Sequence, residues 1–386
     1  MSPRAAITGW AWRTALGSDV ETVWSGLVDG RRAARPCFRP GRVGAPLLDV
    51  PAPMPKHRRF LTPFLALSIQ TALEAARRAG CKGGPRVALF AAVGGLKVAW
   101  PEILPAFQKI SADGQGAWDQ GLRELHPFWL LKHLSNNAHA LASADLETRG
   151  EGATFGGANA GAQALCAALR CLADGAADAA IVMAADSLLG PEALVELESS
   201  SLLSRAALDG LAAPYDSSAA GFVPGEATAA LVLEPESRAG SHKLALLSAA
   251  EGADGSPGQP RGELLARLAG EIGRGAEVVD GVGCAQAAWD RVERDALSAA
   301  LGSKELPLTC DASALGQTGA ARSLIQAMTL AAALRHGRLA PIAGLRSPAA
   351  GPLRPLERPE PTKARIGIGL SAGAPGLAGA VRVELP

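Results

Sequence analysis

The stretch that decides the fold of this chain is residues 214–234, which read PYDSSAAGFVPGEATAALVLE. Its first half is rich in Gly, Pro and Ser, which favour turns. Its end, Ala229–Glu234, is a continuous apolar run that stops at a charged residue. A short run of this kind is typical of a strand buried on both faces. The stretch therefore predicts an irregular turn that leads into a strand of a covered sheet.

Outward from this stretch, short apolar runs alternate with longer amphipathic segments. The runs at 86–93 and 179–185 predict buried strands, and the amphipathic segments predict helices at 62–79, 162–174, 290–301 and 323–335. Strands that alternate with helices predict an α/β fold with parallel strands and helices on both faces.

The alternation runs twice along the chain, before and after a polar stretch at residues 251–261. We therefore expect two similar halves, 1–240 and 241–386, packed into one compact unit. Residues 97–150 are irregular and rich in Trp, Pro and His. They predict an excursion from the sheet of the first half.

Composition excludes several classes of protein. The 386 residues carry a net charge of +1, which gives no reason to expect nucleic-acid binding. The longest uncharged stretch, 152–169, contains Asn, Gln and four Gly, so no membrane span is expected. Ten basic and four acidic residues precede position 60; they form either a face for an acidic partner or solvated loops.

The six cysteines show no metal-ligand spacing, so we expect buried thiols and neither a metal nor another cofactor. The first residues are interrupted by charge and Gly and do not resemble a signal peptide. These features predict a cytoplasmic protein.

Taken in order, several segments resemble the β-ketoacyl synthase family over essentially the whole chain. The most specific is residues 214–234, where the family has a Pro-Phe-Asp, a Gly-Phe-Val-x-Gly-Glu and a Leu-Val-Leu-Glu segment. The other segments are Ile7-Thr8-Gly9 with residues 15–21, Trp24 and Gly30, then residues 174–178, Gly316 with residues 318–321, and Ile366-Gly367-Ile368-Gly369.

The resemblance implies a thiolase-like fold of five layers, α-β-α-β-α, built from two similar halves and forming dimers. It also implies decarboxylative condensation of acyl thioesters carried on an acyl carrier protein. In such enzymes a cysteine takes the acyl chain and two histidines drive decarboxylation and stabilise the developing oxyanion.

The three catalytic positions hold residues that cannot perform this chemistry. Ala158 stands at the cysteine position, in a Gly-rich turn that precedes Gly161-Ala162-Gln163. Val282 and Gln317 stand at the two histidine positions, and Ala312 replaces the lysine that precedes the second one. None of the six histidines aligns with either site. We therefore expect no intrinsic condensing activity.

Other residues near these motifs are candidates to replace the missing groups. Cys166 and Cys284 are more consistent with core thiols than with nucleophiles. Glu226 keeps its motif position, with a structural role expected. Ile366, Ile368 and Leu370 stand where the family has its gate, which predicts either a repacked core or a reshaped tunnel.

The sequence thus predicts a non-condensing subunit that resembles a chain length factor. It would pair with an active ketosynthase and shape its elongation pocket in polyketide, aryl-polyene-like or fatty-acid-like biosynthesis. Aromatic polyketide partners typically carry Gln at the cysteine position, so Ala158 weakens that assignment. The alternatives are a self-associating scaffold that binds an acyl chain or the acyl carrier protein, and an acyltransferase or hydrolase with a relocated nucleophile.

The partner interface is expected close to the nucleophile turn. Ketosynthases typically dimerise through a strand beside it, here residues 148–163. Ala153-Thr154-Phe155 is the apolar, strand-like part of that segment. We therefore expect Phe155 at or near the interface.

Overall fold

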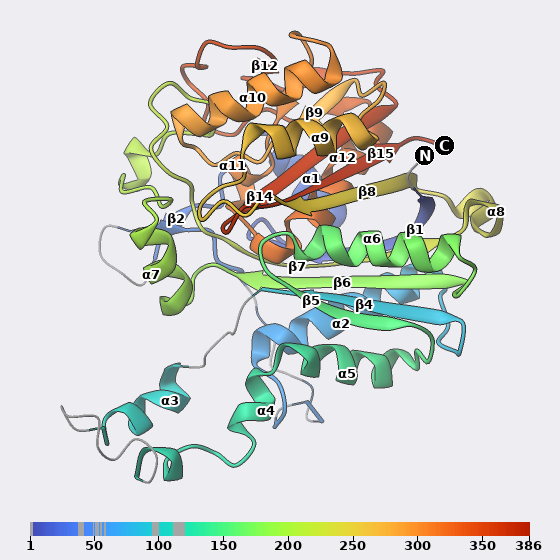
Figure 1. The fold of residues 1–386 in the computed structure, drawn as a ribbon, viewed down its shortest axis with the longest axis vertical. Coiled ribbons are helices and arrows are strands. Elements are labelled where there is room, and N and C mark those ends of the chain that lie inside the picture. Colours follow the sequence, from blue (N-terminus) through green and yellow to red (C-terminus); the bar gives the residue numbers. More distant parts are fainter. Residues whose placement is uncertain are drawn as a thin grey trace.

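The computed structural model describes residues 3–37, 42–48, 50, 54, 56–57, 59–94, 100–110 and 120–386. Its elements stack in five layers, α-β-α-β-α, as the family resemblance implied (Figure 1). Helices α2 (Pro63–Ala79) and α5 (Ser135–Leu146) form one outer layer. Helices α9 (Gly262–Ile272) and α10 (Ala287–Leu301) form the other. Between the two halves of the large sheet lie α6 (Ala160–Ala173) and α12 (Arg322–His336).

Eleven strands of the described chain form one continuous sheet. The five of the first half are β1 (Arg4–Arg13), β4 (Val87–Val93), β5 (Gly152–Gly156), β6 (Ala179–Ser187) and β7 (Glu226–Glu234). The others are β8 (Ala245–Ala253), β9 (Val278–Asp280), β10 (Pro307–Thr309), β12 (Arg354–Pro355), β14 (Ile366–Gly373) and β15 (Leu377–Glu384). Two further pairs of short strands are antiparallel: β2 (Arg35–Pro36) pairs with β3 (Val43–Gly44), and β11 (Arg338–Leu339) pairs with β13 (Glu360–Pro361).

The topology of the first half is repeated in the second. The order β1-β7-β6-β4-β5 has two antiparallel pairs followed by two parallel pairs. The order β8-β15-β14-β9-β10 has the same pattern. The two sets meet where the start of β1 pairs antiparallel with β8. The predicted boundary at residue 240 falls between β7 and β8, and the division into 1–240 and 241–386 stays a prediction.

Local sequence accounts for the central elements. Every residue of β4 is buried, as expected for a strand covered on both faces. Helix α2 begins after Thr62, whose hydroxyl accepts from the Leu65 amide, with Pro63 in the first turn. It ends at Gly80, which adopts the left-handed conformation that glycine tolerates best.

The predicted excursion, 97–150, is divided by the structure. Helices α3 (Trp100–Phe107) and α4 (Trp129–His133) project away from the body of the molecule (Figure 1). Helix α5, by contrast, packs against α2, β4 and β5. The excursion therefore ends before α5, because that helix covers the outer face of the first sheet.

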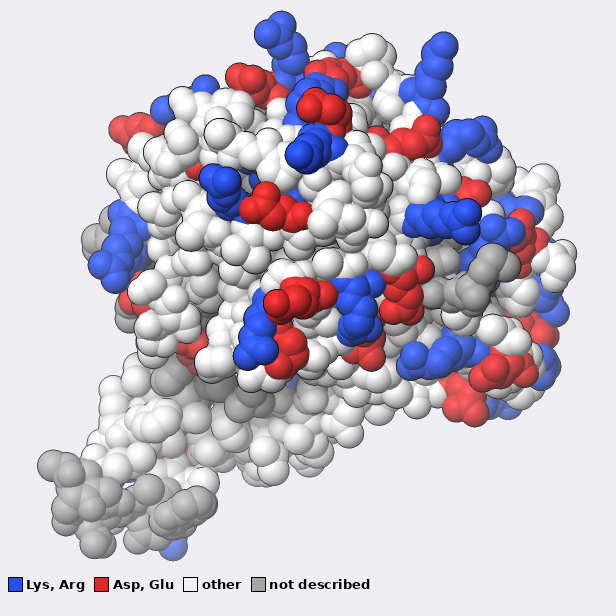
Figure 2. All heavy atoms as spheres, turned by 45° about the horizontal axis from the view of Figure 1, so that its top comes forward, with Lys and Arg blue, Asp and Glu red and all other residues white. Residues whose placement is uncertain are grey.

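The remaining helices are α1 (Val20–Val28), α7 (Pro191–Ser199), α8 (Glu236–Ala239) and α11 (Ala312–Leu315). On the face shown in Figure 2, basic and acidic side chains are interspersed and neither sign forms a continuous field. No helix in the described part of the chain has the length and apolar character needed to cross a bilayer.

Candidate functional site

The turn between β5 and α6 carries Ala158, at the predicted nucleophile position. Gly157 precedes it with φ of +101°, a conformation that a side chain would strain. The backbone of Gly373, at the end of β14, lies directly over the Ala158 methyl group; a Cβ atom at Gly373 would stand 2.3 Å from it. The sharp strand-to-helix turn is thus present, and its central residue carries only a methyl group.

A cavity of about 400 Å³ opens beside this turn. The first half of the chain contributes Ala158 and Asp186 to its wall, and the second half contributes Cys284, Gln317 and Arg322. The remaining walls come from α7, Leu202, Phe222 and the β14–β15 turn. Its size is in the range of small-molecule pockets.

The two predicted histidine positions lie in direct contact. The side-chain amide of Gln317 donates to the backbone carbonyls of Val282, at 2.7 Å, and Gly283, at 2.9 Å. Val282 itself is buried and its amide donates to Glu293 at 2.7 Å. The structure therefore brings Val282 and Gln317 together, next to the cavity that Ala158 and Gln317 line.

The groups that could replace the missing chemistry are poorly suited to it. None of the six histidines lines the cavity. Burial raises the pKa of the Cys284 thiol well above its usual range, and raises that of Cys166 to about 12. A protonated thiol is a weak nucleophile. Glu226 accepts from the Leu47 amide and the Ser187 hydroxyl, which is a structural role.

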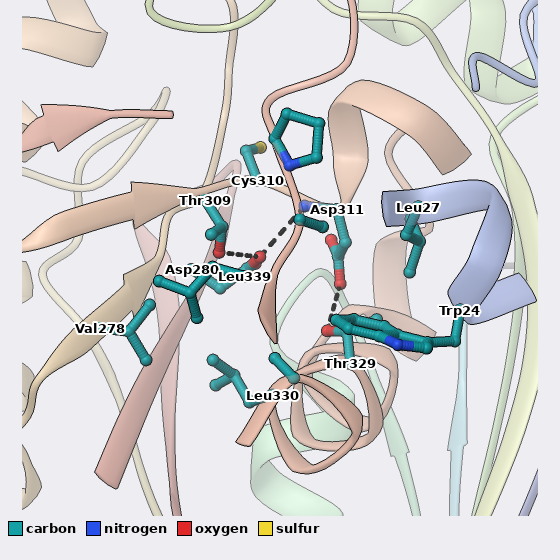
Figure 3. Close-up of a pocket in the computed structure, with 13 residues that line it drawn as sticks. Trp24, Leu27, Val278, Asp280, Thr309, Cys310, Asp311, Thr329, Leu330 and Leu339 are labelled. Atoms are coloured by element: carbon teal, nitrogen blue, oxygen red, sulfur yellow. Dashed lines mark hydrogen bonds between the residues drawn. The ribbon is translucent and has the colours of Figure 1, made fainter. Parts of the chain in front are cut away.

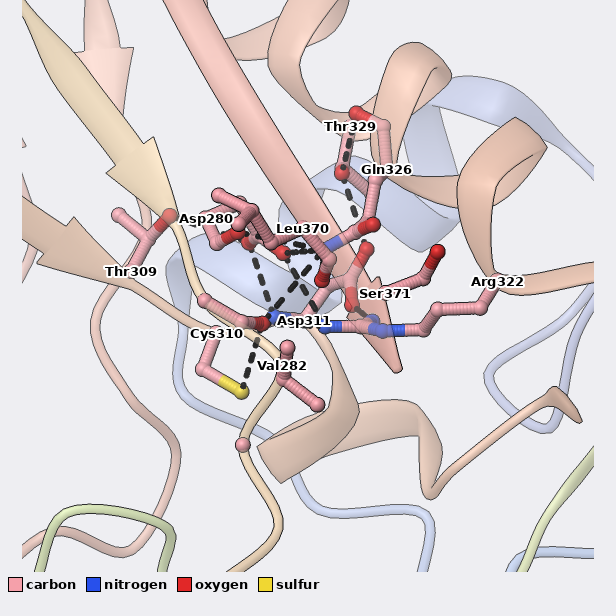
Figure 4. A network of polar contacts seen from close by, with 12 residues as sticks. Asp280, Val282, Thr309, Cys310, Asp311, Arg322, Gln326, Thr329, Leu370 and Ser371 are labelled. Carbon is pink, nitrogen blue, oxygen red and sulfur yellow. Dashed lines mark hydrogen bonds and ion pairs between the residues drawn. The ribbon is translucent and has the colours of Figure 1, made fainter. Parts of the chain in front are cut away.

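A buried charge network lies behind the cavity (Figure 4). Arg322 forms ion pairs with Asp280 and Asp311. Asp280 also accepts from Thr309 at 3.1 Å and from Gln326 at 2.9 Å. The predicted lysine position is Ala312, so Arg322 supplies a cation beside Asp311 from a different point of the chain.

A second cavity, of about 20 Å³, lies on the far side of this network (Figure 3). Its walls include Trp24, Asp280, Asp311 and Thr329. It has the volume of about one water molecule and cannot hold a substrate. Among the residues that the structure describes, no three His, Cys, Asp or Glu side chains are grouped to bind a metal ion.

Comparison with known proteins agrees with this geometry. Residues 49–239 match the sequence model of the family described as beta-ketoacyl synthase, N-terminal domain. A stretch of 146 residues is 35% identical to the actinorhodin polyketide beta-ketoacyl synthase 2 of Streptomyces coelicolor. That match covers 35% of this chain and 36% of the relative. Residues 49–239 belong to the β-ketoacyl synthase family.

Solved ketosynthases have the same fold. A β-ketoacyl synthase from Burkholderia phymatum superposes with a TM-score of 0.85 and 20% identity, and the ishigamide ketosynthase/chain length factor with 0.86 and 20%. Both matches cover all of both chains. The ketosynthase from module 6 of the Bacillus subtilis bacillaene synthase gives 0.82 and 19%, over 99% of this chain and 72% of the other.

The position predicted for the ketosynthase gate requires correction, and of the two alternatives for these residues the structure supports the repacked core. Ile368 and Leu370 point into the core between β14 and the outer helices, and neither they nor Ile366 line the cavity. The cavity is lined instead by the stretch Ala372–Pro375 and by Leu377. Ala372-Gly373-Ala374-Pro375-Gly376 has glycines at the second and fifth places of the family's Phe-Gly-Phe-Gly-Gly, which places two alanines where it has phenylalanines.

Phe155 is half-buried in β5, which pairs on one side with β4 and is the last strand of the sheet. Asp186 and Arg322 are among the cavity residues that the sequence analysis did not identify. Asp186 is the next-to-last residue of the apolar strand β6, and Arg322 follows Gly319-Ala320-Ala321 where the family motif ends in glycine. Both are charged residues at the ends of apolar segments, which is a signal that could have identified them.

Removal of the Arg322 charge should destabilise the protein strongly. Arg322→Met leaves two buried carboxylates without their cation, which typically costs about 3–5 kcal/mol. The matched control is Arg291→Met, because Arg291 and its partner Asp295 are both exposed; it should cost about 0–1 kcal/mol. Urea unfolding of both variants measures the difference. Equal costs would contradict an anchoring role for Arg322.

Glu293 should make stability depend on pH. Burial and, as the second cause, the nearby Asp290 carboxylate raise its pKa from 4.5 to about 8. Between these values the folded state keeps a proton that the unfolded state has lost, so stability falls as pH rises through this window. The contribution is fully present below about pH 4.5 and is lost above about pH 8.

Glu293→Gln removes this titration. We expect the unfolding free energy of the unmodified protein, relative to this variant, to fall by up to about 1.4 kcal/mol per pH unit within the window. Urea unfolding between pH 5 and 8 measures it, with the exposed Glu263→Gln as control. A difference that stays constant with pH would show that Glu293 is ionised throughout.

Proposed function

We propose that this chain is a non-condensing, chain-length-factor-like subunit that pairs with an active ketosynthase. The observation that carries the proposal is Ala158, which occupies a preserved strand-to-helix turn where the family has its nucleophile. A methyl group cannot form a thioester. The strand-to-helix turn is present and a cavity of about 400 Å³ lies beside it, so the fold can serve a role that needs no nucleophile.

The free edge of β5 supports a partner interface at this place. An edge strand presents unpaired backbone groups that another chain can extend. Phe155, half-buried against the main core, adds apolar surface there. Pairing across this edge would bring the partner close to the β5–α6 turn, and thereby close to the cavity. We infer that the partner is an active ketosynthase and that this chain shapes its elongation pocket in polyketide, aryl-polyene-like or fatty-acid-like biosynthesis.

The partner and the cellular setting follow from the same proposal. An acyl carrier protein would meet the heterodimer, since the active subunit takes its substrates from that carrier. The place of action would be the cytoplasm. The relative named for actinorhodin polyketide biosynthesis and the solved ketosynthase/chain length factor are consistent with a polyketide setting.

The thioester chemistry can be tested on the isolated chain. The unmodified protein should gain no acyl group after incubation with an acyl thioester, as followed by intact-protein mass spectrometry. Ala158→Cys should acylate slowly, because it regains a thiol at a helix start but neither histidine. Ala158→Ser is the control without a thiol. Efficient condensation by the single cysteine variant would mean that the histidine positions are assigned wrongly.

The pairing is tested by co-expression with an active ketosynthase from the same organism, followed by size-exclusion chromatography and native mass spectrometry. We expect a heterodimer, and we expect Phe155→Asp to abolish it, because a buried unpaired charge costs several kcal/mol. Val292→Asp, on the outer face of α10, is the control for an added surface charge. Thermal unfolding of each variant alone separates lost association from lost folding.

Separate elution of the two unmodified proteins, together with full-length product from the ketosynthase alone, would rule out the partner role. The alternative, a self-associating scaffold that binds an acyl chain or the carrier protein, would then predict a homodimer in the same measurement.

A further inference from the structure

Residues 280–284 form the loop that carries Val282, the first histidine position. Each backbone N–H and C=O group of Val282 and Gly283 makes a hydrogen bond with a side chain. The Val282 amide donates to Glu293, and the Gly283 amide donates to the Tyr215 hydroxyl at 3.1 Å. Both of their carbonyls accept from Gln317. The side chains of Glu293, Tyr215 and Gln317 thus fix this loop together.

The Tyr215 hydroxyl is the group that links these contacts. It accepts from the Gly283 amide and donates to Glu293 at 2.9 Å. The family has phenylalanine at this place in its Pro-Phe-Asp segment, so the hydroxyl is an addition in this chain. Without it, both the Gly283 amide and one oxygen of Glu293 would lose a partner in a buried place.

Gly281 makes room for that hydroxyl. A Cβ atom at position 281 would stand 1.9 Å from the Tyr215 oxygen, a separation that two atoms cannot adopt without a shift. The family motif has a residue with a side chain before its histidine. Tyr215 and Gly281 are therefore departures that fit one another: the hydroxyl occupies the space that the missing side chain leaves.

Tyr215 also keeps an unfavourable backbone conformation. Its φ is +63°, which costs a bulky residue energy. Its amide donates to Asp290 at 2.9 Å and its carbonyl accepts from Ala349 at 2.8 Å, so the surroundings impose the conformation. The side chain is fully buried. Strain of this kind persists where the position of the side chain matters.

We propose that Tyr215, with the space left by Gly281, locks the 280–284 loop as a rigid wall of the cavity. Tyr215 is a positioning residue: it acts through Gly283 on Gln317 and Cys284, which line the cavity. The lock goes beyond the partner role proposed above and does not depend on it. The loop that would carry the first catalytic histidine is thereby held in one conformation.

The Cys284 thiol reports on the lock, because it lines the cavity but is only 1% exposed. In Tyr215→Phe the loop should open more often, and alkylation of Cys284 by iodoacetamide should become about tenfold faster, which corresponds to about 1.4 kcal/mol. Peptide mass spectrometry identifies the modified cysteine. Cys166, buried in α6 and outside the cavity wall, is the internal control and should keep its rate.

The pairing of Tyr215 with Gly281 is tested by a double-mutant cycle in urea. Gly281→Ala should shift the unfolding midpoint much less in the Tyr215→Phe background, although the ring carbon at 2.9 Å must still move slightly. The proposal is overturned if Cys284 keeps its rate, if Cys166 and Cys284 accelerate equally, or if the two substitutions are additive. If Gly281→Ala prevents folding in both backgrounds, the alkylation rates alone decide.

Discussion

The start of α6 is the point on which the whole site depends, because there the two halves approach too closely for a side chain. A Cβ atom at Gly161 would lie 2.5 Å from the Ala320 carbonyl oxygen. The turn that carries Ala158 is thereby pressed against the turn that carries Gln317. Asp186 reinforces the contact, since it accepts from the Ala320 amide at 2.8 Å and lies under Gly94 and Gly319. The packing of the two halves sets the geometry of the cavity, so this geometry persists whether or not the site is catalytic.

Sequence predicted the fold well because the decisive signals are local. Apolar runs such as β4 and the capped helix α2 are specified by their own residues. The distance between Val282 and Gln317 along the sequence does not reveal that they are in contact. Both residues were aligned with the two histidine positions through neighbouring motif residues, including glycines. Strand β8 was missed, since ALLSAAEGA lacks both the alternation and the β-branched residues that indicate a strand.

The misplaced gate has a physical explanation. Glycines recur along β14 for two different reasons. Gly367 and Gly369 are needed because Cβ atoms there would meet Leu330 at 2.9 Å and Gln326 at 3.0 Å, on α12. Gly373 is needed because the strand end passes over Ala158. A Gly-x-Gly pattern alone cannot distinguish helix packing from a turn at the cavity, so the motif was matched six residues too early.

The charges around the cavity bear on the same question as the missing nucleophile. Decarboxylation builds up negative charge that donors fixed in the site must stabilise. Among the described residues of the cavity wall, Arg322 is the basic one, and its charge is already matched by Asp280 and Asp311. A thiol restored at position 158 would therefore find the cation of this wall already engaged with two carboxylates.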